Sequence, residues 1–150
     1  MMDWNLKEFS ELDALALYKI LRLRVDVFVV EQNCPYPEID GKDLDCWHLY
    51  REAKGEIAAY ARLLSPGISY SEASIGRVIV NDSFRGQKLG EQLIKEAIAQ
   101  SQKLWPGQKI KIGAQAHLQD FYGRNGFKPV SEIYLEDGIP HIDMLREPSN

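Results

Sequence analysis

The sequence has few cysteines, no long apolar run and little net charge. Cys34 and Cys46 are its only cysteines, and their spacing fits neither a disulfide framework nor a metal centre. No apolar run approaches the length of a membrane span, and the first residues lack the basic and apolar stretches of a secretory signal. These absences predict a cytoplasmic protein without a metal site.

The charge balance limits the partners of the chain. A net charge of −4 over 150 residues argues against a general binder of nucleic acid or of anionic membranes. A polyanionic ligand would therefore need local positive charge, and Arg77, Arg85 and Lys88 provide it within a short stretch. The length fits one domain, which we expect to span residues 1–150.

Hydrophobic periodicity predicts a domain of mixed α/β (α+β) structure. In chain order, we expect a strand at 3–9, a helix from about 11 into the 20s, hairpin strands at 46–52 and 56–64, a strand at 75–80, a helix closed by Pro106-Gly107, a strand at 109–114, a short helix at 117–126 and two strand-like runs within 128–146. Ser10 is expected to cap the first helix, and Leu12, Leu15, Ile20 and Val27 to supply its core face.

A strand, a polar turn and a basic, glycine-bearing segment follow one another from Ile75 to Gly90. The first N–H groups of a helix have no partner within it and carry the positive end of its dipole, so they bind phosphate oxygens. Glycine lets a ligand approach the main chain, and Arg85 and Lys88 add full positive charge. The junction is therefore predicted to bind an anion.

This junction resembles the acetyl-CoA-binding signature of the GNAT superfamily of N-acetyltransferases. The resemblance is carried by Arg85-Gly86-Gln87-Lys88-Leu89-Gly90 after Val78-Ile79-Val80. Lys88 departs from the signature, because it stands at the position of the first glycine. The resemblance implies that the main chain of 78–80 holds the pantetheine arm of acetyl-CoA and that 85–90 hold its phosphates.

A second stretch resembles the same superfamily. Phe121-Tyr122 and Gly126-Phe127 match it, whereas Gln115 and Leu118 replace an asparagine and an alanine. The resemblance implies that Gln115 and Phe121 contact the cofactor. Residues 21–36 and 137–142 are similar to the ElaA-like branch, so the likeness covers nearly the whole chain. The implied fold is a central, mixed but mostly antiparallel twisted sheet flanked by helices in three layers.

The implied reaction is transfer of an acetyl group to a primary amine by direct attack in a ternary complex. Tyr122 lies at the position of the usual general acid of these enzymes. The general base is left open among Glu31, His48, His117 and His141, since a carboxylate or imidazole can accept the ammonium proton.

Two features are candidates for binding the acceptor amine, together with His141. Arg24, Phe28 and Glu31 share one stripe of a continued helix, which is either a surface ion pair beside a buried ring or an acceptor-binding wall. The acidic loop at 33–45 is either solvated surface or a mouth that attracts a cationic amine. The acceptor itself, a small molecule or a protein amine, is left open.

Two other functions compete with N-acetyl transfer. An acyl-homoserine-lactone synthase has a related fold and a similar spacing of Arg24 and Phe28, but it uses S-adenosylmethionine and an acyl-carrier protein. A non-catalytic acyl-CoA-binding sensor is the third reading. The oligomeric state is open, although exposed strand edges in this fold commonly pair, and a homodimer is one expectation.

Overall fold

The computed structural model describes residues 4–149. Its elements are β1 (Asn5–Glu8), η1 (Phe9–Glu11), α1 (Ala14–Val25), η2 (Asp26–Glu31), η3 (Lys42–Asp45), β2 (Trp47–Ala53), β3 (Glu56–Leu64), β4 (Ser74–Val80), η4 (Asp82–Phe84), α2 (Leu89–Leu104), β5 (Ile110–Gln115), η5 (Ala116–Leu118), α3 (Gln119–Gly123), β6 (Lys128–Pro129), β7 (Tyr134–Glu136) and β8 (Ile139–Arg146). Within the described residues, no helix has the length and hydropathy that a bilayer span requires.

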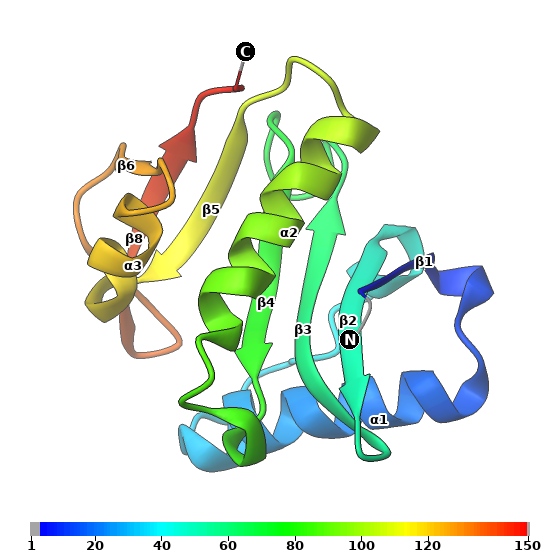
Figure 1. The fold of residues 1–150 in the computed structure, drawn as a ribbon. Coiled ribbons are helices and arrows are strands. Elements are labelled where there is room, and N and C mark those ends of the chain that lie inside the picture. The colour runs from blue at the N-terminus through cyan, green and yellow to red at the C-terminus, as the bar shows by residue number, and fades with distance from the viewer. Residues whose placement is uncertain (1–3, 150) are drawn as a thin grey trace.

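The strands form two antiparallel sheets that meet between β4 and β5. One sheet has the order β1-β2-β3-β4, and the other has the order β5-β8-β6 with β7 also paired to β8. One parallel bridge, between Ala73 and Ile110, joins the two sheets near the start of β5. Figure 1 shows β5 diverging from β4 beyond this point. The predicted, mostly antiparallel sheet is confirmed, and its divergence opens the space that holds the site.

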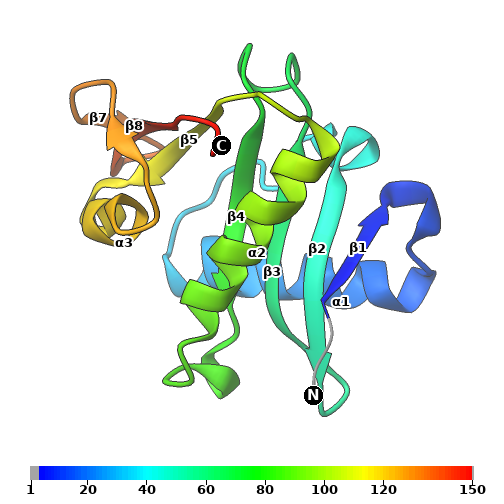
Figure 2. The ribbon, with the colours of Figure 1, turned by 45° about the horizontal axis from the view of Figure 1, so that its top comes forward.

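Helices cover both faces of the first sheet, as Figures 1 and 2 show. The core on one face joins Leu93, Ile94 and Ala97 of α2 to residues of β3, β5 and β8. A smaller core on the other face joins Ile20 of α1 to Tyr60 of β3. Alternate side chains of a strand point to opposite faces, so one central sheet can bind a helix on each side. The predicted three-layer arrangement is confirmed.

The first helix starts later than predicted. It begins at Ala14, and Asp13 rather than Ser10 caps it, because Asp13 Oδ1 accepts a hydrogen bond of 2.7 Å from the Ala16 N–H. Three of its four predicted core residues are correct, since Ile20 is buried and Leu12 and Val27 pack against the same cluster. Leu15 is 62% exposed, whereas Arg24 is fully buried.

The helix continues beyond Val25 as a π-helix, η2, from Asp26 to Glu31. A π-helix has a wider turn than an α-helix, so residues that follow it no longer keep the α-helical spacing. Arg24, in the last turn of α1, is buried, whereas Glu31, at the end of the π-helix, is exposed. The predicted common stripe of Arg24, Phe28 and Glu31 is wrong for this reason.

Strand β4 contains a β-bulge where it approaches the second sheet. Ala59 and Tyr60 pair with Val80 and Ile79, but the register then shifts before Arg62 pairs with Gly76. Arg77 lies in the bulge with a φ of 51°, in the left-handed region that non-glycine residues rarely adopt. The bulge interrupts the ladder between β3 and β4, and Gly76, Arg77 and Val78 of this part of β4 line the opening between β4 and β5.

The turn before β8 follows its prediction. Asp137 and Gly138 have φ values of 49° and 78°, as a two-residue type I′ turn requires. They connect β7 to β8, which pairs with β5 from Ile110 to Gln115. This hairpin forms the far wall of the opening between the two sheets.

Candidate active site

A cavity of about 760 Å³ lies where β4 and β5 diverge. Its walls are β4, the end of β5, η5 with α3, the π-helix and the hairpin of β7 and β8. The predicted cofactor and acceptor residues that line it are Val78, Ile79, Val80, Arg85, Gly90, Gln115, Phe121, Tyr122, Phe28 and His141. The fold thus brings both sequence stretches that resemble the GNAT superfamily to one cavity.

The start of α2 has the features of an anion-binding turn. Lys88 is the N-cap residue with a φ of 57°, and Gly86 has a φ of 86°. The left-handed conformation of Lys88 explains why a glycine is the usual residue there. Within residues 4–149, the first main-chain bond of the helix is from the Gln92 N–H to the Lys88 carbonyl at 3.3 Å. The preceding amides, including that of Gly90, are left without a main-chain acceptor.

The other residues of this turn contribute main chain or charge. Leu89 packs its side chain in the core, so it can reach a ligand only through its main chain. Gln87 is exposed and does not line the cavity. Arg85 is half exposed, and it forms ion pairs with Asp82 and, at 3.5 Å, with Glu31. An exposed pair is weak, so Arg85 can exchange these carboxylates for phosphate oxygens.

Tyr122 of α3 is buried and lines the cavity. Its ring packs edge-on against Phe121 and Phe127, with centroid distances of 5.1 and 5.9 Å. Burial raises the pKa of Tyr122 to about 12. The phenol therefore keeps its proton at neutral pH, as a proton donor must.

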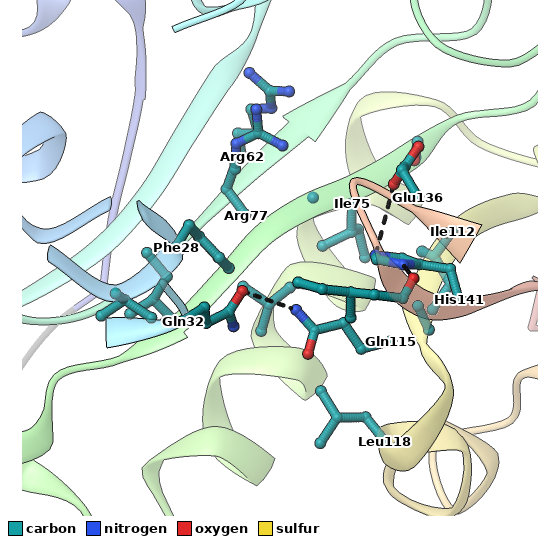
Figure 3. A pocket seen from close by; sticks show the side chains of 18 of the residues that line it. Phe28, Gln32, Arg62, Ile75, Arg77, Ile112, Gln115, Leu118, Glu136 and His141 are labelled. Carbon is teal, nitrogen blue, oxygen red and sulfur yellow. Dashed lines mark hydrogen bonds and ion pairs between the residues drawn. The ribbon is translucent and has the colours of Figure 1, made fainter. Parts of the chain in front are cut away.

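His141 and Glu136 lie on the wall opposite Arg62 and Arg77, as Figure 3 shows. His141 Nδ1 is 2.8 Å from the carbonyl oxygen of Ile139, which can only accept, so Nδ1 carries a proton. His141 Nε2 faces Glu136 Oε2 at 3.5 Å. Sequence reasoning named His141 but missed Glu136, because the two residues meet only through the hairpin.

Of the other three candidates for the general base, two lie outside the cavity and one lines it. His48 is fully buried, does not line the cavity and is held between the Tyr60 hydroxyl at 2.7 Å and the Asp43 carbonyl at 3.0 Å. Burial lowers the pKa of His48. Glu31 lies beside Arg85 and does not line the cavity. His117 lines it but is exposed at the start of η5.

Arg24 is a structural residue and not the acceptor contact that was predicted. Its side chain is fully buried and does not line the cavity. Arg24 Nε donates to Glu38 Oε1 at 2.7 Å, and Nη1 donates to Asp43 Oδ1 at 2.7 Å. The guanidinium is thus held by two buried carboxylates, which leaves it no path to a ligand.

Two further arginines complete a buried ion network with these acids. Arg62 binds Asp40 at 2.7 Å and Asp43 at 3.1 Å, and Arg77 binds Glu38 at 3.0 Å and Asp40 at 3.5 Å. We call Arg24, Arg62, Arg77, Glu38, Asp40 and Asp43 the ion network. The prediction of an acidic, amine-attracting mouth in the loop at 33–45 is wrong, because arginines of α1, β3 and β4 neutralise three of its acids.

The ion network makes the stability of the fold sensitive to acid. Burial alone would raise the pKa of Asp43, but hydrogen bonds and charge from Arg24 and Arg62 lower it below its ordinary value. A carboxyl with a lowered pKa stabilises the fold above its unfolded pKa of about 3.9, and this stabilisation is lost as the pH falls further. We expect the free energy of unfolding in urea to fall by about 1 kcal/mol for each such carboxyl between pH 7 and pH 3. Equal values at both pH values would contradict this.

A second polar cluster at the cavity was not found from the sequence. Tyr134 Oη donates to Asp143 Oδ1 at 2.6 Å, beside the main chain of Gly113. A Cβ atom at Gly113 would lie 3.0 Å from Tyr70 Oη and 3.3 Å from Tyr134 Oη. A glycine inside an alternating strand indicates such a close approach, so Gly113 was the residue that could have predicted this cluster from the sequence.

A model of the acetyltransferase (GNAT) domain matches residues 19–148 of the chain. The chain is 48% identical over 149 residues to protein ElaA of Escherichia coli strain K12, which covers 98% of this chain and 97% of that protein. The crystal structure of Escherichia coli ElaA is similar with a TM-score of 0.92, over 98% of this chain and 100% of that one.

Two other solved structures are similar in fold to this chain. The crystal structure of an acyl-CoA N-acyltransferase from Pseudomonas aeruginosa has a TM-score of 0.92 and 47% identity, over 97% of this chain and 99% of that one. The acyl-homoserine-lactone synthase LasI has a TM-score of 0.79 at 15% identity, over 98% of this chain and 90% of that one, and shares the fold alone. With its cavity between diverging strands and a domain match over most of its length, the chain belongs to the GNAT acetyltransferase family, in its ElaA-like branch, and is an acyltransferase.

Proposed function

We propose that this protein uses acetyl-CoA to acetylate a primary amine by direct attack in a ternary complex. The observation that carries the proposal is the cavity between β4 and β5, which joins an anion-binding turn at one end to a polar pocket at the other. A thioester placed between these ends can be reached by an amine without a covalent enzyme intermediate. Binding both reactants in one cavity removes much of the entropic cost of bringing them together.

The residues of the cavity fit acetyl-CoA as the first substrate. Its volume of about 760 Å³ is in the range of small-molecule sites. The unpaired amides at the start of α2 and Arg85 offer donors to a diphosphate. The main chain of 78–80 next to the bulge offers donors and acceptors to the amide groups of pantetheine. Gln115 adds a side-chain amide, which donates to Gln32 at 3.4 Å when no ligand competes.

The second end of the cavity supplies the acid and the base. We assign the base to His141, because among residues 4–149 no main-chain group bonds its Nε2, and Glu136 can stabilise the imidazolium that forms. The ammonium gives one proton to His141, and the neutral amine forms a C–N bond with the thioester carbon. The C–S bond then breaks, the thiolate takes the proton of Tyr122, and the second proton of the nitrogen restores the tyrosine.

Release of free thiol from acetyl-CoA in the presence of amines tests the proposal. We expect release to depend on an amine and the N-acetyl product to appear by mass spectrometry. Binding of acetyl-CoA in calorimetry without release for any amine would favour a sensor and contradict the proposal. Transfer only to S-adenosylmethionine would favour the reaction of a homoserine-lactone synthase and would contradict it too.

Arg85→Ala is expected to weaken CoA binding in a salt-dependent way. The guanidinium is half exposed, so its attraction to phosphate is screened by ions. We expect the Kd for CoA in calorimetry to rise about 10-fold at low ionic strength, and the difference to shrink in high salt. Arg22→Ala, in an exposed arginine of α1, is the matched control. Equal affinities of the Arg85 variant and the unmodified protein would count against the phosphate-binding turn.

A further inference from the structure

One wall of the cavity carries a surplus positive charge at Lys42. Lys42 lines the cavity, and its Nζ donates to Ser69 Oγ at 2.9 Å. In the part of the chain that the structure describes, no carboxylate lies within ion-pair distance of this ammonium. A lysine that lines a substrate cavity with only a hydroxyl partner is available to bind an anion.

The neighbouring cations of this wall are already neutralised. Arg62 and Arg77 also line the cavity, but their guanidinium groups hold carboxylates of the ion network. Together with Arg24, this network pairs three arginines with three carboxylates. Its charges cancel, so among the described residues of this wall Lys42 carries the surplus positive charge.

The facing wall carries negative charge. Glu136 and Asp137 of the hairpin line the cavity, and among the described residues neither has a lysine or arginine within ion-pair distance. His141 Nδ1 carries a proton toward the Ile139 carbonyl, so in the neutral ring Nε2 is an acceptor. This acceptor lies 3.5 Å from Glu136 Oε2, so the two groups can accept from one donor placed beside them. An ammonium group would satisfy both.

We propose that the acceptor is an amino acid or a similar small amino carboxylate, whose ammonium binds Glu136 and His141 and whose carboxylate binds Lys42. This rests on the proposed acetyl transfer and names its substrate class. A single negative charge matches the single surplus charge of Lys42, whereas the second ammonium of a diamine would meet repulsion there. The side chain of a lysine within a protein lacks the required carboxylate.

Matched pairs of acceptors test this class with the full chain and saturating acetyl-CoA. Each of the common amino acids is compared with its primary amide and with 1,4-diaminobutane, with thiol release and product mass as readouts. We expect the free acid of the favoured side chain to have a kcat/KM about 10-fold above that of its amide. Lys42→Met should remove this preference by lowering kcat/KM for the acid alone. Lys54→Met, in the exposed turn between β2 and β3, is the control.

The alternative outcomes separate the acceptor class from the reaction. A preference for amides or 1,4-diaminobutane would overturn the amino carboxylate and leave acetyl transfer intact. If Lys42→Met lowers kcat/KM equally for acids and for amides, the role of Lys42 is overturned. Bound acetyl-CoA without transfer to any amine would overturn the proposed function itself.

Discussion

Arg24→Met is expected to lower the free energy of unfolding by about 3–5 kcal/mol. The substitution removes a fully buried guanidinium and leaves Glu38 and Asp43 buried at 3% and 8% side-chain exposure. Each carboxylate then depends on one remaining arginine of the ion network. Burial of incompletely paired charges is costly, so breaking such a network is far worse than removing an exposed pair.

A matched control, Arg22, lies two residues before Arg24 on the same helix. Arg22 is 72% exposed and contacts Asp26 at 3.9 Å, so Arg22→Met should change the free energy of unfolding by less than about 1 kcal/mol. Arg24→Lys keeps the charge but loses the forked donors, and we expect an intermediate loss. Urea unfolding measures all three variants. A loss below about 1 kcal/mol for Arg24→Met would show that the ion network does not stabilise the fold.

The elements with strong local signals could be predicted from the sequence. The apolar stripe of α2, the alternation of β5 and the Asp137-Gly138 turn all have the predicted structure, because each depends on residues close together in the chain. The first helix could not be placed as well. Ser10 and Asp13 are both good caps, and local sequence does not decide between them.

Hydrophobic periodicity in the sequence could not predict the π-helix after Val25. Its β-branched residues indicated a weak helix, but they do not reveal a turn one residue wider. Arg24 is buried in the ion network, whereas Phe28 lines the cavity and Glu31 is exposed. A pattern that is correct for an α-helix thus predicted the wrong neighbours for a site residue.

The two ends of the candidate site differ in how far they could be predicted. The proposed cofactor end is encoded locally, because Arg85, Gly86 and Gly90 belong to one turn and need only the helix that follows. The proposed acceptor end is built from segments far apart in the chain, among them Lys42, Ser69 and Glu136, which all line the cavity. The acids of the loop at 33–45 were visible in the sequence, but their arginine partners in β3 and β4 were not.

Tyr122→Phe is expected to lower turnover about 100-fold or more with little change in CoA affinity. A positioned proton donor contributes on the order of 10²–10⁴ to a rate, and the phenol is the group assigned to the departing thiolate. The ring keeps its packing against Phe121 and Phe127 in the variant, so the shape of the cavity is preserved. Loss of the hydroxyl therefore separates proton donation from binding.

The pH dependence of the unmodified enzyme strengthens the test of Tyr122. Because burial raises its pKa to about 12, Tyr122 in the free enzyme stays protonated at neutral and mildly alkaline pH. A rise of kcat/KM with pH near neutrality then reports deprotonation of the base or the amine, and it should persist at a lower level in Tyr122→Phe. Tyr50→Phe, in a tyrosine buried on the α1 side of the sheet, is the control and should keep full turnover. If Tyr122→Phe has the turnover of the unmodified enzyme at saturating substrates, the thiolate takes its proton from another donor.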